Sequence, residues 1–415
     1  MENFEVTPAI IWLACSACMV FLMQLGFSLL EAGLVRAKNT VNVIMKNYID
    51  MCVGATGYWM IGYGMMYGLN SSGFIGTTEF FKSSGSAFEF TNLFYQAMFA
   101  ATAGTILSGA VAERIRYTPY IIHSSLVCVF TYSIYGAWVW NENGWLAKLG
   151  FLDFAGSGVV HLIGGAAALA AVIVLGPRLG RFSSSGVPRE IPGHSLPLFA
   201  MGAFILWFGW FGFNGGSIFA VKGGANLGLV LLNTYLGGST GTLACFLLLK
   251  ALGRPITMGH ILNAGLAGMV AITASAAFVI PPFALIIGAL AGIAVPWTTS
   301  ILLNRFKLDD VVGAIPVHMG SGIIGLLCLG LFHRDTGLLA GGVNAGAYQL
   351  GVQALGALVA VAWAFSTSYL FLKLVALMMP LRVDSKAEQR GLDYAEHDEV
   401  SYPEFGDSFA PDRKG

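Results

Sequence analysis

The residues of this sequence with the clearest capacity for chemistry are two histidines at equivalent places in an internal repeat. The segments Asp153–His161 (DFAGSGVVH) and Asp310–His318 (DVVGAIPVH) carry Asp, Gly, Val and His at the same offsets, 157 residues apart. Both histidines lie in apolar runs, where an ionisable side chain is costly and by default marks a pathway. Two imidazoles that meet at a repeat axis could share one proton and form a hydrogen-bonding track, or a proton wire, through a dry pore. For either histidine alone, the alternative is a core residue that donates to a backbone carbonyl.

Each copy of the repeat begins with an aspartate, eight residues before its histidine. Two compatible functions fit Asp153: a buried carboxylate that sets the potential for a cation, and an N-terminal helix cap. For Asp310 we favour capping. The six cysteines lie in apolar runs, and only Cys15 and Cys18 are close in sequence. We therefore predict no metal site and no cofactor.

Composition indicates the environment in which these residues act. Of the 415 residues, 56% are apolar and 11% are charged, and the mean hydropathy is +0.71. A soluble domain carries about 25% charged residues, so a soluble enzyme, a disordered protein and a nucleic-acid binder are excluded. Acidic and basic residues balance at 22 each, so no basic field attracts a polyanionic partner. The sequence is that of a polytopic membrane protein, and it offers no support for an enzyme.

The apolar runs predict an all-α fold with eleven transmembrane helices. A bilayer core of about 30 Å requires about 20 apolar residues in a helix. By this criterion the spans are 9–34, 48–69, 93–112, 118–139, 156–176, 196–216, 226–249, 258–280, 283–304, 312–332 and 346–378. The long alternating pattern of a β-barrel is missing from the sequence. We divide the chain into a transmembrane domain, residues 1–380, and a charged tail, residues 381–415.

Basic residues predict the orientation of these spans. The loops after spans 1, 3, 5, 7 and 9 hold twelve Lys and Arg residues, whereas the opposite loops hold four. By the positive-inside rule, the N-terminus lies outside the cell membrane and the tail lies in the cytoplasm. The first apolar run is longer than a signal peptide requires and lacks its basic flank, so we expect a retained helix.

The two histidine segments open spans 5 and 10 and therefore run in opposite directions through the membrane. Spans 1–5 and 6–10 are thus candidates for an inverted repeat, with span 11 left over. In transporters built this way, the permeation site lies near the membrane midplane between the repeats.

Several segments together resemble the Amt/Mep/Rh ammonium transporters, on the Amt side. They are Gln24–Asn39 (QLGFSLLEAGLVRAKN), Ala112–Arg116 (AERIR), the two histidine segments, Gly209–Ser217 (GWFGFNGGS) and Gly391–His397 (GLDYAEH). The motifs occur in family order over nearly the whole chain. The resemblance implies an ammonium transporter or channel that forms a homotrimer with one pore per subunit.

The resemblance also assigns the pore residues. It implies an outer ammonium site of Trp140, Phe99 and Ser217, with Asp153 as an essential outer carboxylate. It implies a gate of two stacked rings, Phe99 and Phe213. Below that gate it places the pore histidines His161 and His318, with Trp210 and Thr273 lining the pore or flanking the outer site. A regulatory protein of the PII type at the cytoplasmic face is a further implied partner.

The physics of a small cation agrees with this assignment. An ammonium ion that enters a low-dielectric pore loses its hydration at a cost of many kcal/mol, whereas an aromatic face returns roughly 2 kcal/mol. Loss of a proton below the outer site removes the charge, and neutral ammonia then crosses past the histidines. Potassium has no proton to lose, so this step also supplies selectivity. The sequence is compatible with two modes of transport, one in which the proton crosses separately and one in which it does not.

Departures from the family pattern are expected to have local effects. Ser157 and Gly158 should loosen the packing around Asp153. The segment Asn141–Asn143 (NEN), which stands in place of a Gly-rich stretch, should make the outer vestibule more polar. Ala395 stands where some relatives carry a regulatory threonine, so phosphorylation at that position is not available.

Other functional classes compete with transport. The first is an ammonium-sensing receptor of the same fold. Such receptors often carry a fused signalling domain, and a tail of about 35 residues is too short to contain a kinase or a cyclase. The sequence contains neither the complete filter motif of a potassium channel nor the Asn-Pro-Ala pair of an aquaporin.

Overall fold

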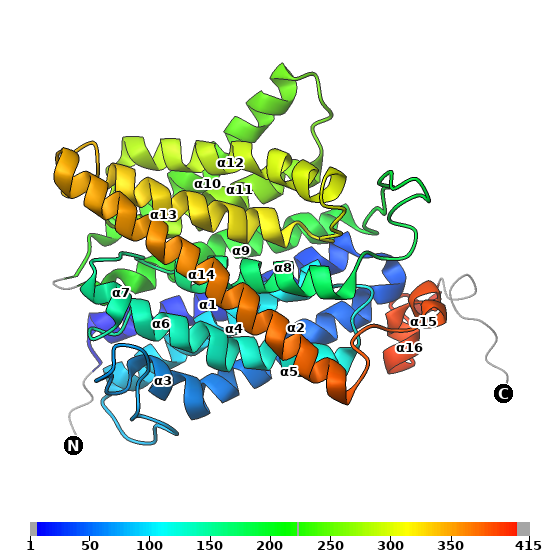
Figure 1. The fold of residues 1–415 in the computed structure, drawn as a ribbon, viewed down its shortest axis with the longest axis horizontal. Coiled ribbons are helices and arrows are strands. Elements are labelled where there is room, and N and C mark those ends of the chain that lie inside the picture. Colours follow the sequence, from blue (N-terminus) through cyan, green and yellow to red (C-terminus); the bar gives the residue numbers. More distant parts are fainter. Residues whose placement is uncertain (1–5, 222–223, 405–415) are drawn as a thin grey trace.

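The computed structural model describes residues 6–221 and 224–404. Within these ranges the chain forms helices and no strand, apart from the isolated β-bridges Ile115–Arg382 and Phe182–Pro188. Figure 1 shows the helices side by side in one bundle, which α14 (Val343–Met378) crosses obliquely. The chain is thus an all-helical integral membrane protein, as its composition predicts.

The helices fall into two consecutive groups. The first contains α1 (Pro8–Leu34), α2 (Thr40–Gly57), α3 (Tyr63–Tyr67), α4 (Ala87–Ala110), α5 (Tyr117–Leu126), α6 (Ser133–Val139), α7 (Trp145–Lys148) and α8 (Ile163–Leu175). The second contains α9 (Leu196–Gly216), α10 (Leu227–Ala251), α11 (Met258–Thr273), α12 (Pro281–Asn304) and α13 (Ser321–Phe332), followed by α14. Short 3₁₀ turns, η1 (Ala37–Asn39) and η5 (Ser217–Ala220), extend two of the helix ends.

Four π-helical segments widen the helices at defined points. The segments η2 (Tyr58–Gly62) and η3 (Val127–Tyr132) join α2 to α3 and α5 to α6. The segments η4 (Ser157–Leu162) and η6 (Ile315–Gly320) lead into α8 and α13, and they carry His161 and His318. Such segments are rare and occur frequently at functional sites.

Helices cover each of the eleven predicted ranges. Among the residues that the structure describes, seven helical stretches are long and apolar enough to cross a membrane. Three boundaries differ clearly from the prediction. Helix α4 begins at Ala87 rather than near 93, because Ser86 and Glu89 form a capping box there. Helix α2 begins at Thr40 rather than near 48, because polar residues of its first turns are buried against neighbouring helices. Helix α11 ends at Thr273 rather than near 280, because the Asn233 amide of α10 holds the carbonyls of Ala276 and Val279 outside a helix, at 2.9 Å each.

Close helix contacts depend on glycine in the centre of the bundle. Helices α1 and α9 cross where a Cβ on Gly33 would meet the backbone of Phe199 and one on Gly202 would meet the backbone of Leu30. Small residues permit such contact between helices in a membrane. The histidine-bearing segments η4 and η6 meet between the two groups of helices, which places the repeat at the core of the molecule.

The tail forms two short helices, α15 (Ser385–Arg390) and α16 (Leu392–His397), as far as the described residues extend. They lie beside α2 and η1 at one end of the bundle (Figure 1). The charged character of the tail suggests full exposure, but Glu388, Leu392 and Asp393 are buried.

Candidate functional site

A cavity of about 540 Å³ opens at the end of the bundle that we expect to face outward. Trp140, Asp153 and Ser217 line it. The Trp140 indole donates from Nε1 to the backbone oxygen of Asp153 at 2.8 Å, which fixes the ring. The Ser217 hydroxyl donates to the backbone oxygen of Phe213 at 3.0 Å. Its oxygen lone pairs thus remain available to accept a hydrogen bond from a ligand.

Two stacked phenylalanine rings lie behind the residues that line this cavity. Phe99 and Phe213 stack with centroids 3.9 Å apart and planes inclined by 16°, and both are fully buried. The Phe99 ring also lies edge-on to Trp140, with centroids 6.2 Å apart. The predicted outer residues and the predicted gate residues therefore form one continuous aromatic wall.

The two histidines meet directly below this stack. His161 Nδ1 and His318 Nδ1 are 3.2 Å apart, and the ring centroids are 5.2 Å apart. The Phe213 ring lies over His161, with centroids 5.3 Å apart. An Nδ1–Nδ1 contact of this length needs one N–H donor and one bare acceptor. A hydrogen bond at this contact places one proton between the two rings.

His161 is held in place by Trp210, whose ring stacks on it with centroids 5.2 Å apart. Trp210 Nε1 donates to Thr273 Oγ1 at 2.8 Å, and that hydroxyl donates to the backbone oxygen of Met269 at 2.7 Å. Trp210 and Thr273 therefore position the histidine pair. The other ring nitrogen of His161, Nε2, has no hydrogen-bond partner among the described residues and is free for a passing molecule.

The two aspartates of the repeat cap the two π-helical segments in the same way. Asp153 accepts from the backbone N–H groups of Gly156, Gly158 and Val159 at 3.2, 2.9 and 2.9 Å. Asp310 accepts from those of Gly313, Ala314 and Ile315 at 3.1, 3.1 and 2.7 Å. Each cap includes a left-handed glycine, Gly156 at φ 107° and Gly313 at φ 81°, a conformation that favours glycine. Capping is thus confirmed at both positions, and the Asp153 carboxylate acts on the backbone rather than directly on the aromatic gate.

Ser157 and Gly158 do not loosen the packing around Asp153. Ser157 donates to the backbone oxygen of Val270 at 2.5 Å, and a Cβ on Gly158 would lie 3.0 Å from the Asp153 carboxylate. This packing is tight rather than loose. Asn141 and Glu142 line the outer cavity, which fits the expected polar vestibule, and the Asn141 amide also donates to the backbone oxygens of Met66 and Gly68.

Sequence reasoning missed Tyr95, which lies one helical turn before Phe99 on α4. Its hydroxyl donates to the backbone oxygen of Phe213 at 2.5 Å and lies 3.1 Å from Ser217 Oγ. It thus joins the gate helix to the outer site. The i, i+4 spacing from Phe99 was the available signal, but a buried tyrosine at that spacing is equally typical of a helix core.

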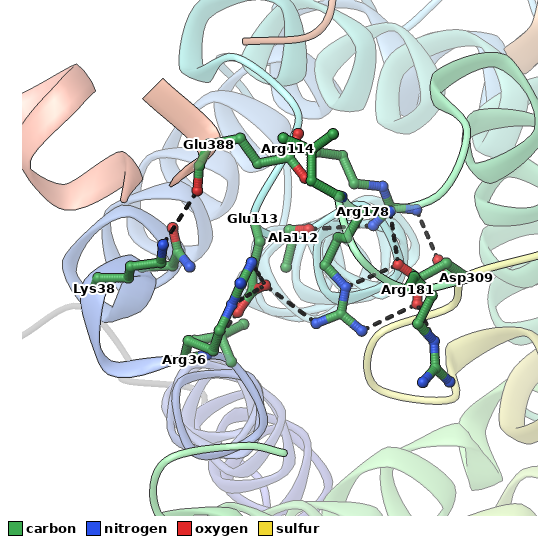
Figure 2. Close-up of polar contacts among 12 residues, drawn as sticks. Arg36, Lys38, Ala112, Glu113, Arg114, Arg178, Arg181, Asp309 and Glu388 are labelled. Atoms are coloured by element: carbon green, nitrogen blue, oxygen red, sulfur yellow. Dashed lines mark hydrogen bonds and ion pairs between the residues drawn. The ribbon is translucent and has the colours of Figure 1, made fainter. Parts of the chain in front are cut away.

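A group of largely buried ion pairs, drawn in Figure 2, lies beside the tail at the end of the bundle that carries α15 and α16. Arg178 pairs with Glu113 at 3.2 Å and with Asp309 at 2.8 Å, and Arg36 pairs with Glu113 at 2.6 Å. Arg114 donates to the backbone oxygen of Asp309 at 2.7 Å. These residues come from four loops far apart in the sequence, so the group ties the loops to one another.

The electrostatics of this ion-pair group favour the charged forms of its acids. Burial alone would raise the pKa of Glu113, but the Arg178 and Arg36 guanidinium groups hold that pKa below its ordinary value. Burial likewise opposes ionisation of Asp309, and the hydrogen bonds and charge of Arg178 hold its pKa well below the usual range. Both carboxylates thus remain ionised at neutral pH.

The tail docks beside this group. Glu388 accepts from Arg382 at 2.8 Å and from the backbone N–H of Leu179 at 2.6 Å. Asp393 accepts from the backbone N–H of Asn42 at 2.8 Å, and Glu396 accepts from that of Tyr117 at 2.8 Å. Acids of the tail therefore bind backbone donors of the loop after α8 and of the first turns of α2 and α5.

Comparisons with known proteins converge on one family. The model of the Ammonium Transporter Family matches residues 11–402. The chain is 41% identical to the ammonium transporter Amt2 of Archaeoglobus fulgidus, over 97% of this chain and 90% of that protein. It is 40% identical to a putative ammonium transporter of Synechocystis, over 93% of this chain and 73% of that protein.

Solved structures give the same result. A structure described as a sensor Amt protein superimposes with a TM-score of 0.90 at 39% identity, over 96% of this chain and all of that one. The crystal structure of Saccharomyces cerevisiae Mep2 superimposes with a TM-score of 0.79 at 29% identity, over 91% and 88% of the two chains.

Proposed function

Because the chain belongs to the ammonium transporter family, we propose that it recruits ammonium at the outer cavity, removes a proton and conducts ammonia past the histidine pair. The observation that carries this proposal is the continuous column of side chains from Trp140 through the Phe99–Phe213 stack to His161 and His318. A column of this kind suits a small molecule that can donate hydrogen bonds and lose its charge.

The outer site supports recruitment of the cation rather than its full dehydration. The faces of Trp140 and Phe99 attract a cation with about 2 kcal/mol when it is desolvated, and Ser217 Oγ can accept one N–H bond. The Asp153 carboxylate contributes negative charge at the cavity wall. The backbone oxygen of the same residue accepts a hydrogen bond from Trp140 and holds that ring in place. These terms are much smaller than the cost of placing a charge among buried rings.

The stacked gate therefore favours passage of the neutral species. When the rings part, ammonia can cross between them without an uncompensated charge. Below the gate, a proton on His161 Nδ1 leaves Nε2 of His161 as an acceptor and makes the Nε2–H of His318 a donor for the molecule in transit. The Nδ1 proton between the rings allows the pair to relay charge, so separate proton transfer is compatible with this geometry.

We further propose that all eleven predicted helices span the cell membrane, with the N-terminus outside and the tail in the cytoplasm. The balance of basic residues in the loops supports this orientation. The family resemblance supports a homotrimer with one pore per subunit. Apolar side chains that remain exposed on α9 and α10, such as Phe204 and Leu247, are available for lipid or for a neighbouring subunit. A PII-type protein at the face that carries the tail is the proposed regulatory partner.

A second candidate function is ammonium sensing with little transport. It is favoured by one observation, the TM-score of 0.90 with a structure described as a sensor Amt protein. A sensor would keep the outer site and the gate but would not pass ammonium at a useful rate.

Solid-supported-membrane electrophysiology on the reconstituted protein tests these alternatives. We expect a transient current on ammonium pulses that potassium pulses do not reproduce. In His161→Ala, which removes the shared proton, we expect loss of that current or of its selectivity against potassium. A silent wild type would contradict charge-coupled transport. A pH-sensitive liposome assay then separates electroneutral ammonia conduction from sensing, because a sensor produces no internal pH change.

A further inference from the structure

The half of the pore beyond the histidine pair contains a buried carboxyl group that the mechanism above does not use. A cavity of about 20 Å³, enough for one water-sized molecule, lies beside His318. Phe27 and Glu31 of α1 line it together with His318. The Phe27 ring lies 6.2 Å from His318 between centroids, and Glu31 follows one helical turn later on the same face of α1. A molecule that leaves the histidines therefore meets Glu31 next.

The Glu31 carboxyl belongs to a small ring of hydrogen bonds. It is 2% exposed. Ser108 Oγ lies 2.5 Å from both of its oxygens and 2.8 Å from Asn47 Oδ1. Asn47 Nδ2 donates to Glu31 Oε2 at 3.1 Å. Among the described residues, no Lys or Arg nitrogen forms an ion pair with this carboxyl.

This ring accommodates both protonation states of Glu31. A serine hydroxyl has one hydrogen, so Ser108 cannot donate to Glu31 and Asn47 at once. When Glu31 is protonated, its O–H donates to Ser108, Ser108 donates to Asn47 Oδ1, and Asn47 Nδ2 closes the ring. When Glu31 is ionised, the Ser108 hydroxyl turns to donate to the carboxylate. One hydroxyl rotation thus exchanges the two states without movement of the backbone.

We propose that Glu31 returns a proton to ammonia after it has passed the histidine pair, an inference that rests on the proposed function. In the cavity, the O–H bond of the Glu31 carboxylic acid breaks and an N–H bond forms, so that ammonium and a carboxylate are produced. Ammonium leaves by the cytoplasmic mouth. A hydronium ion from cytoplasmic water then gives its proton to the carboxylate and leaves as water, which restores the starting state.

The other titratable groups near Glu31 do not share its position. Lys46 and Asp50 of α2 and Tyr120 of α5 do not line the cavity, whereas His318 does. Asp50 is fully buried and accepts from Tyr120 at 3.0 Å and Thr105 at 3.1 Å. It is therefore a matched control: a buried carboxyl on the neighbouring helix α2, outside the cavity beside His318.

The test compares wild type, Glu31→Gln and Asp50→Asn in liposomes by two measurements. The first is the initial rate of ammonium-driven flux. General acid catalysis contributes roughly 100-fold or more, so we expect the flux of Glu31→Gln to fall at least about tenfold and that of Asp50→Asn to stay within about twofold. The second is the infrared difference spectrum on addition of ammonium. We expect loss of a carboxylic-acid C=O band in wild type and Asp50→Asn, and no such band in Glu31→Gln.

The two measurements separate a chemical role from a structural one. Wild-type flux in Glu31→Gln, or reduced flux with the carboxylic-acid band still present, would overturn the proposal. If Glu31→Gln does not purify as a folded protein, Ser108→Ala replaces it, and we expect that variant to shift the band because the ring is broken; an unshifted band overturns the proposal. A wild type without ammonium flux contradicts transport itself, and the infrared comparison then decides on Glu31 separately.

Discussion

At the scale of single residues, Ser217 illustrates how the outer site combines weak interactions. Its hydroxyl hydrogen is used by the backbone oxygen of Phe213, so only its lone pairs can bind a ligand N–H. This is one charge-assisted hydrogen bond next to two aromatic faces. The affinity of the site for a cation must therefore depend on every one of these partners.

Ser217→Ala removes that acceptor and leaves the aromatic faces intact. A hydrogen bond to a charged group contributes about 1.5–3 kcal/mol, so we expect the half-saturating ammonium concentration to rise by about tenfold or more. The maximal rate should change much less, because the gate and the histidines are untouched. Concentration-dependent currents measure both quantities. Ser72→Ala, on an exposed outer loop, is the control, and an unchanged half-saturation in Ser217→Ala would contradict a binding role.

The two histidines could be predicted from the residues alone, because their type is unusual where they occur. Two histidines in apolar runs, at matching places in a repeat, are rare enough to indicate their pairing. Trp140, Phe99 and Phe213 were expected only from the family resemblance, and Tyr95 gave no signal, since an aromatic residue in an apolar helix is the normal case. The packing of Asn141 was not predictable either, because its amide donates to two carbonyls of residues that are distant in sequence.

At the scale of elements, the two π-helical segments determine where the histidines point. A left-handed glycine lies directly before η4 and two residues before η6, and the aspartate three residues before each glycine caps the segment. The wide turn rotates the following helix relative to a regular α-helix, which brings His161 and His318 to the same point from opposite sides. The sequence predicted the caps, but it contained no signal for the π-turn, whose extra residue has no characteristic composition.

Asp153→Asn and Asp310→Asn test the role of these caps. An amide side chain has one oxygen acceptor instead of two and no charge, so at least one backbone N–H loses its partner in each variant. We expect each substitution to cost about 2 kcal/mol and to lower the midpoint of thermal unfolding by several degrees. Tryptophan fluorescence of the detergent-solubilised protein measures that midpoint. Conversely, equal midpoints for the variants and wild type would show that the caps do not stabilise the segments.

At the scale of the whole molecule, the tail and the loops at the end of the bundle that carries it form one connected structure. Arg178 links Glu113 to Asp309, and Glu388 of the tail accepts from the loop that follows Arg178. The tail therefore contacts segments that belong to different helices. Its burial was not predictable from its charged composition, because Glu388, Asp393 and Glu396 each accept from a backbone N–H group, which carries no sequence signal.

The docked tail is expected to loosen at low pH through His397. Burial lowers the pKa of His397 in the docked state, and Glu396 offsets this only in part. The undocked tail therefore binds a proton more readily, so docking is strongest above about pH 6.5 and weakens as the pH falls below it. Hydrogen–deuterium exchange of α15 and α16 between pH 5.5 and 7.5 measures the effect. We expect a smaller pH dependence in His397→Gln, and an unchanged profile would rule out this histidine.

The Phe99–Phe213 stack has a consequence for timing. At 3.9 Å between centroids, nothing passes while the rings stay in place, so every crossing waits for a thermal fluctuation that parts them. If parting the rings costs about 10 kcal/mol, the rate is limited to roughly 10⁵ crossings per second. Molecules then cross one at a time, each during a separate opening of the rings. Because opening is an activated step, the interval between crossings lengthens steeply on cooling.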